Sequence, residues 1–246
     1  MRSIRLFTDA PLEPGHAVTL PAQAAAHALR VLRLKAGDAV TLFNGDGHEY
    51  PARLVTAGAR DVRAEVASRT SPVRESPLHV TLIQALARGE KMDWITQKAT
   101  ELGIARIVPV TTGRSEVKLD AARGGKRLEH WRAVAIAACE QCGRNAIPVI
   151  EAPVELSAWL KTSGATEPGA RWMLHPDGAT RVRDLQATSP GELLLAVGPE
   201  GGFGEIDLDA LHGAGFRGLS LGPRILRTET AGVVAIAAVQ ALYGDL

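Results

Sequence analysis

Strand-like and helix-like segments alternate along the chain from Leu78 onward, and this alternation restricts the fold more than any other feature of the sequence. Short apolar runs are typical of buried strands, and the longer segments between them have apolar residues at helical spacing. This order predicts an α/β fold with a mainly parallel sheet. The expected strands are 78–82, 104–110, 171–174, 192–197 and 218–221, and the expected helices are 91–102, 127–142, 206–212 and 228–242.

The first part of the chain has a different pattern, with short β-like runs broken by turn signals. The runs 39–43 and 49–55 are separated by Asn44-Gly45-Asp46-Gly47, whose glycines suit a tight hairpin. A third run, 62–66, alternates apolar and charged residues, and 22–32 is helix-like. This pattern predicts a small β-barrel with one helix. The polar, proline-containing stretch 68–77 is the expected linker, so we predict domains at 1–72 and 73–246.

A glycine-rich turn follows directly after one apolar strand. Residues 193–197 lead into Gly198-Pro199-Glu200-Gly201-Gly202. In an open parallel sheet, ligands bind outside the carboxyl ends of strands, where glycine lets the backbone approach them. A plain turn between strand and helix would need one glycine, so three glycines favour a ligand site. The loop has neither the dinucleotide fingerprint nor the phosphate loop of nucleotide-binding proteins, which disfavours both.

Two further strand ends carry similar signals. The strand that ends near Leu221 runs into Gly222-Pro223, and the chain then enters an apolar helix through an expected threonine N-cap. Arg224 and Arg227 lie on this connection, on a segment too short to be a solvated helix face. The third end is 173–176, which reads Met-Leu-His-Pro. Together the three ends predict one pocket.

Charge and cysteine content leave two questions open. The net charge of +1 argues against a protein that coats nucleic acid nonspecifically, yet arginines cluster near residues 30–35 and 114–132. Arginine suits phosphate and base edges, but a solvated helix face with mixed charge is the alternative.

Cys139 and Cys142 have the spacing of a redox or metal pair, but no second pair exists, which favours structural thiols.

The sequence has no feature that directs it to a membrane. No apolar run approaches the roughly 20 residues that span a bilayer. The amino-terminal segment has no long apolar stretch after its positive charges, unlike a secretory signal. We therefore expect no membrane partner and a cytoplasmic location.

The loops resemble those of a known family. Gly198–Gly202 and 221–230, which reads Leu-Gly-Pro-Arg-Ile-Leu-Arg-Thr-Glu-Thr, are similar to the two signature loops of the RsmE family, which methylates N3 of a uridine in small-subunit ribosomal RNA. Similar segments are 88–92, 97–103 and 140–144, and 27–34 resembles that family's amino-terminal module. The matches cover nearly the whole chain.

The resemblance implies a fold, a cofactor and partners. The fold would be a PUA-like β-barrel followed by a SPOUT α/β domain with a C-terminal trefoil knot, a rare exception to the rule that chains are not knotted. The cofactor would be S-adenosylmethionine, held in the knot loops of a homodimer, and no metal would be needed. The partner would be small-subunit ribosomal RNA or the assembled small ribosomal subunit.

The implied site residues fall into three sets. The cofactor-binding set is Leu174, His175, Pro176, Val197, Gly198, Pro199, Gly201, Gly202, Leu221, Gly222, Ile225, Leu226 and Thr230. The RNA-binding set is Arg30, Arg33, Arg88, Lys91, Arg114, Lys118, Arg123, Lys126 and Arg144. The catalytic set is Arg224, Arg227 and Glu200.

The chemistry of N3 methylation explains the catalytic set. Uridine N3 must lose a proton, and the resulting charge spreads onto O2 and O4. Arg224 and Arg227 would hold and acidify the base, because a guanidinium binds a delocalised oxyanion at two points. Glu200 is a candidate general base, although it could instead hold the loop or face the sulfonium charge. The alternatives are ribose 2′-O-methylation and a non-catalytic RNA-binding assembly factor.

Overall fold

The chain forms two compact units. The structure, a computed structural model, describes residues 4–58, 61–115, 121–162, 168–185 and 188–246, without the side chains of 121–123. One unit comprises Met1–Glu75 with Ile136–Ile147, and the other comprises Ser76–Ala135 with Pro148–Leu246. The division after Glu75 falls inside the stretch expected to be the linker. The sequence did not predict that 136–147 would join the first unit.

The first unit contains a five-stranded sheet in the order β1-β3-β4-β5-β2. Its strands are β1 (Arg5–Phe7), β2 (Ala17–Thr19), β3 (Ala39–Phe43), β4 (Tyr50–Gly58) and β5 (Asp61–Val66). β1 pairs with β3 in parallel, and the other pairs are antiparallel. Among the described residues no ladder joins the two edge strands, so the expected barrel is here a sheet with two edges of three residues each.

The helix of the first unit changes its winding partway. α1 (Ala22–Ala26) continues into a π-helical turn, η1 (His27–Val31), where Leu32 N–H donates to the carbonyl of His27. Two residues after η1, Arg33 has a φ of +56°, which only a few per cent of non-glycine residues adopt. The apolar side of this helix packs with the buried face of the sheet through Ala24 and Ala28.

The second unit is built on an eight-stranded sheet in the order β11-β13-β10-β12-β6-β7-β8, with β9 also pairing with β7. The strands are β6 (His79–Ala85), β7 (Arg106–Thr111), β8 (Val149–Ile150), β9 (Val154–Glu155), β10 (Ala170–Leu174), β11 (Thr180–Arg181), β12 (Glu192–Val197) and β13 (Arg217–Ser220). All its strand pairs are parallel. The prediction of a mainly parallel sheet is confirmed.

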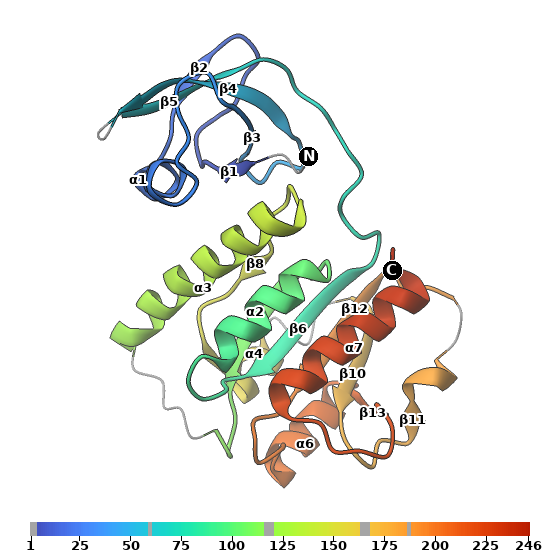
Figure 1. Ribbon diagram of the computed structural model, residues 1–246. Coiled ribbons are helices and arrows are strands. Elements are labelled where there is room, and N and C mark those ends of the chain that lie inside the picture. Colours follow the sequence, from blue (N-terminus) through green and yellow to red (C-terminus); the bar gives the residue numbers. More distant parts are fainter. Residues whose placement is uncertain (1–3, 59–60, 116–120, 163–167, 186–187) are drawn as a thin grey trace. The chain divides into compact units, whose positions relative to one another are not determined.

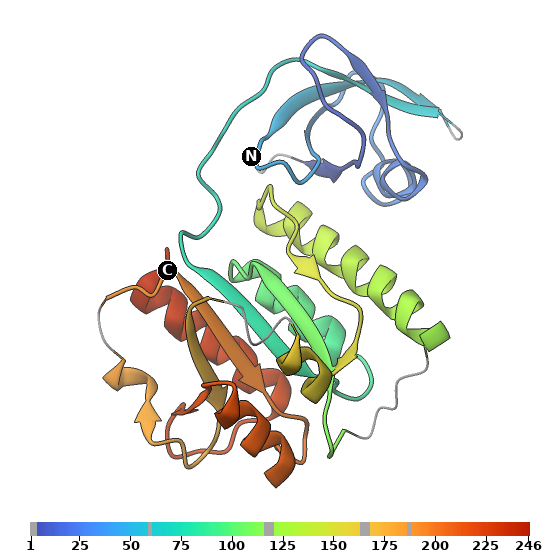
Figure 2. The ribbon, with the colours of Figure 1, turned by 180° about the vertical axis from the view of Figure 1, so that it is seen from behind.

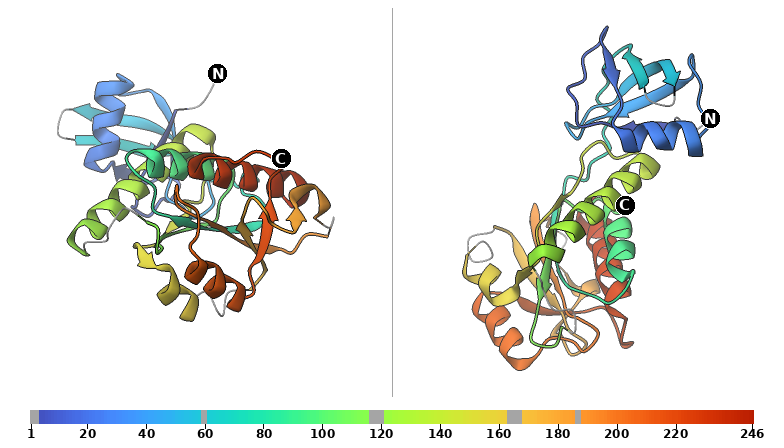
Figure 3. Two further views of the ribbon diagram at one scale, coloured as in Figure 1. Left: turned by 90° about the horizontal axis from the view of Figure 1, so that it is seen from below. Right: turned by 90° about the vertical axis from the view of Figure 1, so that its left-hand side faces the viewer.

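Helices cover both faces of this sheet (Figures 1 and 3). α2 (Lys91–Glu101), the first part of α3 (Ala121–Cys142) and α7 (Thr228–Tyr243) lie on one face. α4 (Leu156–Lys161) and α6 (Glu205–Gly213) lie on the other, which Figure 2 turns toward the viewer. A short 3-10 helix, η2 (Val182–Asp184), follows β11. No helix in the described ranges has the length and apolar character to cross a membrane.

Each face of the sheet has its own apolar core. Leu82 and Leu195 point to the face covered by α2 and α7, where they join Ile95 and Ile236. The neighbouring residues of the same strands point to the other face and pack with α4 and α6. Because β13, β10 and β12 are adjacent and parallel, their carboxyl ends meet at one edge of the sheet. The loops after these strands are therefore brought together.

Candidate functional site

A cavity of about 570 Å³ lies where these three loops meet. Its walls come from 174–177 after β10, 197–203 after β12 and 221–228 after β13, with Lys91, Arg114, Leu219 and Ala231 completing them. The cavity is of the size that small-molecule sites occupy. The single pocket predicted from three strand ends is thus present in the structure.

The loop after β12 is held by residues from outside it. Arg114 Nη1 donates to the carbonyl of Gly201 at 3.0 Å. Asp207, in the first turn of α6, accepts from the backbone N–H groups of Gly204 and Gly113 at 3.1 and 3.2 Å. Gly198 is needed for the turn, because a Cβ there would lie 3.0 Å from the backbone nitrogen of Phe203. These contacts hold the middle and the far end of the loop.

A buried hydroxyl joins this loop to α7. Thr228 Oγ1 donates to the carbonyl of Gly198 at 2.6 Å and accepts from Gln84 Nε2 at 3.0 Å. The expected threonine N-cap is wrong: α7 begins at Thr228, and its N-cap residue is Arg227, which makes no capping hydrogen bond. The hydroxyl is used for a tertiary contact rather than for capping its own helix.

Glu200 forms a charged group with residues of two helices. Its Oε1 accepts from Lys91 Nζ at 2.8 Å and from the backbone N–H of Arg88 at 3.3 Å. Lys91 Nζ also lies 3.5 Å from Oε2 of Glu229 in the first turn of α7. Lys91 therefore links the loop after β12 to the start of α7.

The surroundings of Glu200 make it a weak base. Burial acts to raise the pKa of Glu200, but the hydrogen bonds from Lys91 and from backbone N–H groups outweigh it, so the pKa is lowered from 4.5. The hydrogen bond to Glu200 in turn raises the pKa of Lys91. A carboxylate that is stabilised in this way accepts a proton less readily. Of the roles open to Glu200, the geometry favours holding the loop.

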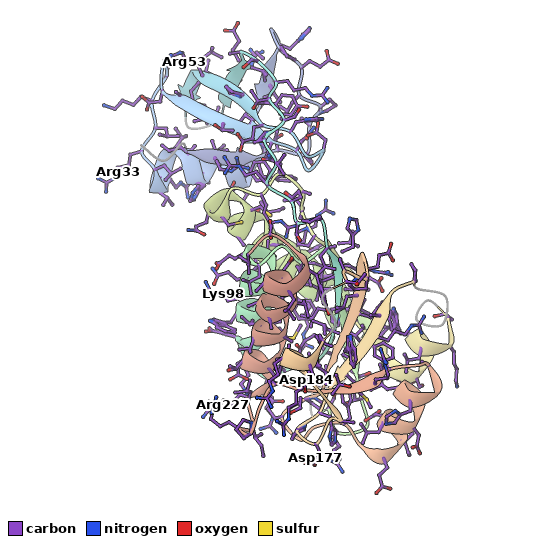
Figure 4. The ribbon with its side chains drawn as sticks, turned by 90° about the vertical axis from the view of Figure 1, so that its right-hand side faces the viewer. Arg33, Arg53, Lys98, Asp177, Asp184 and Arg227 are labelled. Atoms are coloured by element: carbon purple, nitrogen blue, oxygen red, sulfur yellow. The ribbon has the colours of Figure 1, made fainter. Side chains whose placement is uncertain are left out.

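The two arginines after β13 are exposed and line the cavity. Neither guanidinium is bonded to another residue in the described part of the chain. Figure 4 shows Arg227 at the start of α7 and Asp177 on the loop after β10, at the same end of the second unit. Ile225, between the arginines, is 84% exposed. Two exposed cationic side chains thus line the cavity.

Most residues of the predicted cofactor set line the cavity, and Thr230 does not. Thr230 lies in the first turn of α7, where its N–H donates to the carbonyl of Arg227. Gly202 and Gly222 have φ of +68° and +121°, which favour glycine, and a Cβ on Gly222 would meet nothing within 4 Å. The backbone beside Gly222 is thus left open to a ligand.

The structure scatters the predicted RNA-binding residues. Arg30 and Arg33 are exposed in the first unit, whereas Lys91 and Arg114 line the cavity. Arg88 and Lys126 are exposed elsewhere in the second unit. Lys118 and the side chain of Arg123 lie outside the described residues.

The assignment of Arg144 to RNA binding is corrected by the structure. Arg144 is 7% exposed, and its Nε donates to Glu75 Oε2 at 2.8 Å. Its carbonyl accepts from Arg5 at 2.8 Å. Arg144 is thus a buried, ion-paired residue inside the first unit and is not presented to a nucleic acid.

The two cysteines are free thiols at the end of α3. A hydrogen bond with Cys142 and burial raise the pKa of Cys139, which keeps that thiol protonated. A reactive cysteine needs a lowered pKa. The structure thus favours the structural interpretation of these residues over a redox role.

Sequence reasoning missed several residues that position the site. Gln84, Thr228 and Asp207 each bond a cavity loop, and Asp177 and Phe203 line the cavity. Asp207 had a detectable signal, because it stands three residues after Gly204 at the start of a helix. Gln84 had one as well, as a polar residue in an otherwise apolar strand.

Two family models match the chain. The model of an RNA methyltransferase domain matches residues 74–240, and the model of an RNA methyltransferase PUA domain matches residues 20–67. The first match contains all three cavity loops. The second covers η1 and most of the sheet of the first unit.

Individual relatives agree with these models over most or all of the chain. A methyltransferase of Legionella pneumophila, solved with bound SAM, is 39% identical with a TM-score of 0.94, and the alignment covers 100% of both chains. The ribosomal RNA small subunit methyltransferase E of Neisseria gonorrhoeae, bound to S-adenosyl methionine, is 36% identical with a TM-score of 0.90, again over 100% of both chains. The protein of that name from Buchnera aphidicola is 32% identical over 88% of this chain and 84% of its own.

Proposed function

The chain belongs to the ribosomal RNA small subunit methyltransferase E family, and from that premise we propose that it transfers the methyl group of S-adenosylmethionine to N3 of a uridine in small-subunit ribosomal RNA. It is thus an S-adenosylmethionine-dependent ribosomal RNA methyltransferase, as the RsmE resemblance implied. The observation that carries the proposal is the cavity built from three neighbouring strand ends.

The residues of the cavity fit this cofactor. Leu174, Val197 and Leu226 offer apolar surface to an adenine ring. The loops after β12 and β13 supply backbone N–H and carbonyl groups, and at Gly222 no side chain stands between that backbone and open space. When bound, S-adenosylmethionine supplies an electrophilic methyl group on a positively charged sulfur.

Arg224 and Arg227 act on the uracil in this proposal. Both are exposed at the cavity and unbonded to other described residues, so a substrate does not have to break an existing ion pair to reach them. Their guanidinium groups would bind O2 or O4 and stabilise the charge that develops as N3 loses its proton. Glu200 holds the loop through Lys91 and is set aside as the base.

We also propose that the second unit is knotted, as the family resemblance implies. The loop after β10 crosses β13 in close contact, since a Cβ on Gly178 would lie 2.7 Å from the backbone carbonyl carbon of Gly218. β11 then pairs with the outer side of β13, and Val182 and Leu185 pack into the core that contains α7. The segment from the end of β10 to Leu185 thus lies against β13 and α7. A trefoil knot requires such a segment around the last strand and helix.

The partners follow from the same proposal. Arg30 and Arg33 on the first unit would contact phosphates of the RNA, in keeping with its match to a PUA domain. α7 would form part of a homodimer interface, because Val234 and Leu242 on this apolar helix are 39% and 43% exposed. The reaction would take place in the cytoplasm, where ribosomal RNA is assembled into subunits.

One measurement tests the reaction and separates it from the alternatives. Purified protein is incubated with S-adenosylmethionine and small-subunit RNA or small subunits, and the nucleosides are analysed by mass spectrometry. We expect N3-methyluridine. A 2′-O-methylated nucleoside would show a different reaction, and cofactor binding without any methylated product on either substrate would support a non-catalytic factor.

Arg227→Ala tests the assigned role of the arginine. If Arg227 stabilises the developing charge, kcat should fall by about a hundredfold or more while the Kd for S-adenosylmethionine changes little. Raising the pH should partly restore the rate, because more uridine is then ionised. Arg227→Lys should restore little, because an ammonium cannot make the planar two-point contact. If Arg227 has only a structural role, the alanine variant will show a lower Tm with nearly normal kcat and KM.

A further inference from the structure

The reaction needs a group that removes the proton from uridine N3, and the site residues proposed above leave this role vacant. The inference therefore rests on the proposed function. Arg224 and Arg227 are cations and cannot accept a proton at neutral pH. Glu200 Oε1 already accepts hydrogen bonds from Lys91 and from the backbone of Arg88. A second carboxylate near the cavity is required.

Glu229 has the features of such an acceptor. Its Oε2 is buried, and no described residue donates a hydrogen bond of ordinary geometry to it. Lys91 Nζ lies 3.5 Å away, at the limit of hydrogen-bond range, because its 2.8 Å contact is made with Glu200. Buried carboxylate oxygens normally have a close donor, so an oxygen whose described partner stands as far as 3.5 Å has room for a donor from a ligand. The N3–H group of uracil is a donor.

Glu229 also lies where a substrate can reach it. A second cavity, of about 640 Å³, is lined by Glu90, Lys91, Asp93, Trp94, Gln97, Val134 and Glu229. Lys91 lines both this cavity and the cofactor cavity, so the two adjoin. Trp94 is 41% exposed and offers an aromatic face on which an unpaired base can stack.

We propose that the uracil ring of the target nucleotide binds where the two cavities adjoin, with O2 or O4 toward the arginines of the first cavity, and that Glu229 accepts its N3 proton. The N3–H electron pair stays on nitrogen and forms the new bond from N3 to the methyl carbon. The electron pair of the broken carbon–sulfur bond remains on sulfur, which becomes a neutral thioether. The proton moves to the Glu229 carboxylate and is later released to solvent. Glu229 is thus a catalytic residue in addition to the two arginines.

Charged groups from two helices face Glu229. Lys91 from α2 is the closest, and Glu200 is bonded to that same lysine. Glu90 and Asp93 line the second cavity, and Asp93 is 2.7 Å from His130 Nε2. Lys91 is thus the cation beside Glu229, and the other groups named here are carboxylates and one histidine.

Glu229→Gln removes the acceptor with little change in shape. We expect kcat on ribosomal RNA to fall by about a hundredfold or more near neutral pH, as for loss of a general base, with unchanged affinity for S-adenosylmethionine by calorimetry. Between neutral and alkaline pH the rate of the variant should rise about tenfold per unit, because the uridine must then ionise unaided. RNA with 5-fluorouridine at the target, whose N3 is more acidic, should restore much of the rate.

Two further variants complete the test. Glu229→Ala should be rescued by added formate and not by chloride, since formate can take the place of the carboxylate. Glu101→Gln is the matched control, because Glu101 is also paired with a lysine, Lys98 at 2.8 Å, but lines neither cavity. We expect wild-type kinetics from it.

The outcomes separate this inference from the proposed function. If the wild-type protein forms no N3-methyluridine, the proposed function fails. If it does, a Glu229→Gln variant with a wild-type pH profile overturns the inference alone. Loss of cofactor binding in that variant would also overturn it, since Glu229 would then only hold the cavity together.

Discussion

The hydroxyl of Thr228 should have a measurable effect on both stability and cofactor binding. It donates to the carbonyl of Gly198 at 2.6 Å and accepts from Gln84 at 3.0 Å, and Thr228 is 6% exposed. Thr228→Val keeps the shape and removes both bonds. Each bond contributes about 0.5–1.5 kcal/mol, and the part-buried carbonyl of Gly198 left without this donor adds to the cost, so we expect a loss of about 2–3 kcal/mol. For a protein of this size, that lowers the Tm by about 4–12 °C.

Thr228→Ser is the matched control, because it keeps the hydroxyl and removes one methyl group. Its cost should be about 1 kcal/mol, or about 2–4 °C in Tm. Melting curves of both variants, with and without S-adenosylmethionine, measure the difference. The valine variant should also bind the cofactor more weakly, since Gly198 loses its contact with α7. A serine variant that melts as low as the valine variant would refute the role of these hydrogen bonds.

Three further changes test other parts of the structure. Gly198→Ala should weaken cofactor binding in calorimetry, because its Cβ would lie 3.0 Å from a backbone nitrogen. Gly213→Ala is the control and should bind normally, since Gly213 lies at the end of α6, does not line the cavity, and its Cβ would meet nothing within 4 Å. Neutralising Arg30 and Arg33 together should reduce the salt dependence of RNA affinity by roughly two units of slope, and an unchanged slope would show that neither contacts phosphate. Lys91→Met should lower the free energy of unfolding, measured with a chemical denaturant, above about pH 4.5. This is the ordinary pKa of Glu200, the carboxylate that Lys91 bonds. The difference from wild type should vanish as the pH falls through the lowered pKa, because the ion pair then no longer exists.

The sequence predicted strands best where one physical signal dominates. β12 has the expected bounds 192–197, because an apolar run is enclosed by a turn signal on each side. β8, β9 and β11 were not predicted, since two residues are too few to show a period. α3 begins before the expected residue 127, at Ala121, although Gly124 and Gly125 have low helix propensity. The low helix propensity of these two glycines is outweighed by the rest of the helix.

The position of the site could be predicted from the sequence, but its hydrogen bonds could not. Strand ends marked by glycine and proline identify an edge of a parallel sheet, and the order β13-β10-β12 makes the three ends neighbours. Thr228 was predicted to cap its helix because threonine at the start of a helix often does so. Its hydroxyl instead donates to the carbonyl of Gly198, which lies 30 residues away in the sequence. A sequence pattern shows the period of a helix or strand, but it does not show which residue a buried hydroxyl will bond.

Glu200 shows most clearly why a role assigned from a motif depends on distant residues. Between two glycines of a ligand loop, a carboxylate is a reasonable base, and nothing nearby in sequence argues against it. Its pKa is lowered by Lys91, which is 109 residues away. The same loop is bonded by Arg114 at Gly201 and by Thr228 at Gly198. Residues from three separate parts of the chain thus hold this loop. Changes in any of these partners should therefore act first on cofactor affinity and only through it on the rate of methyl transfer.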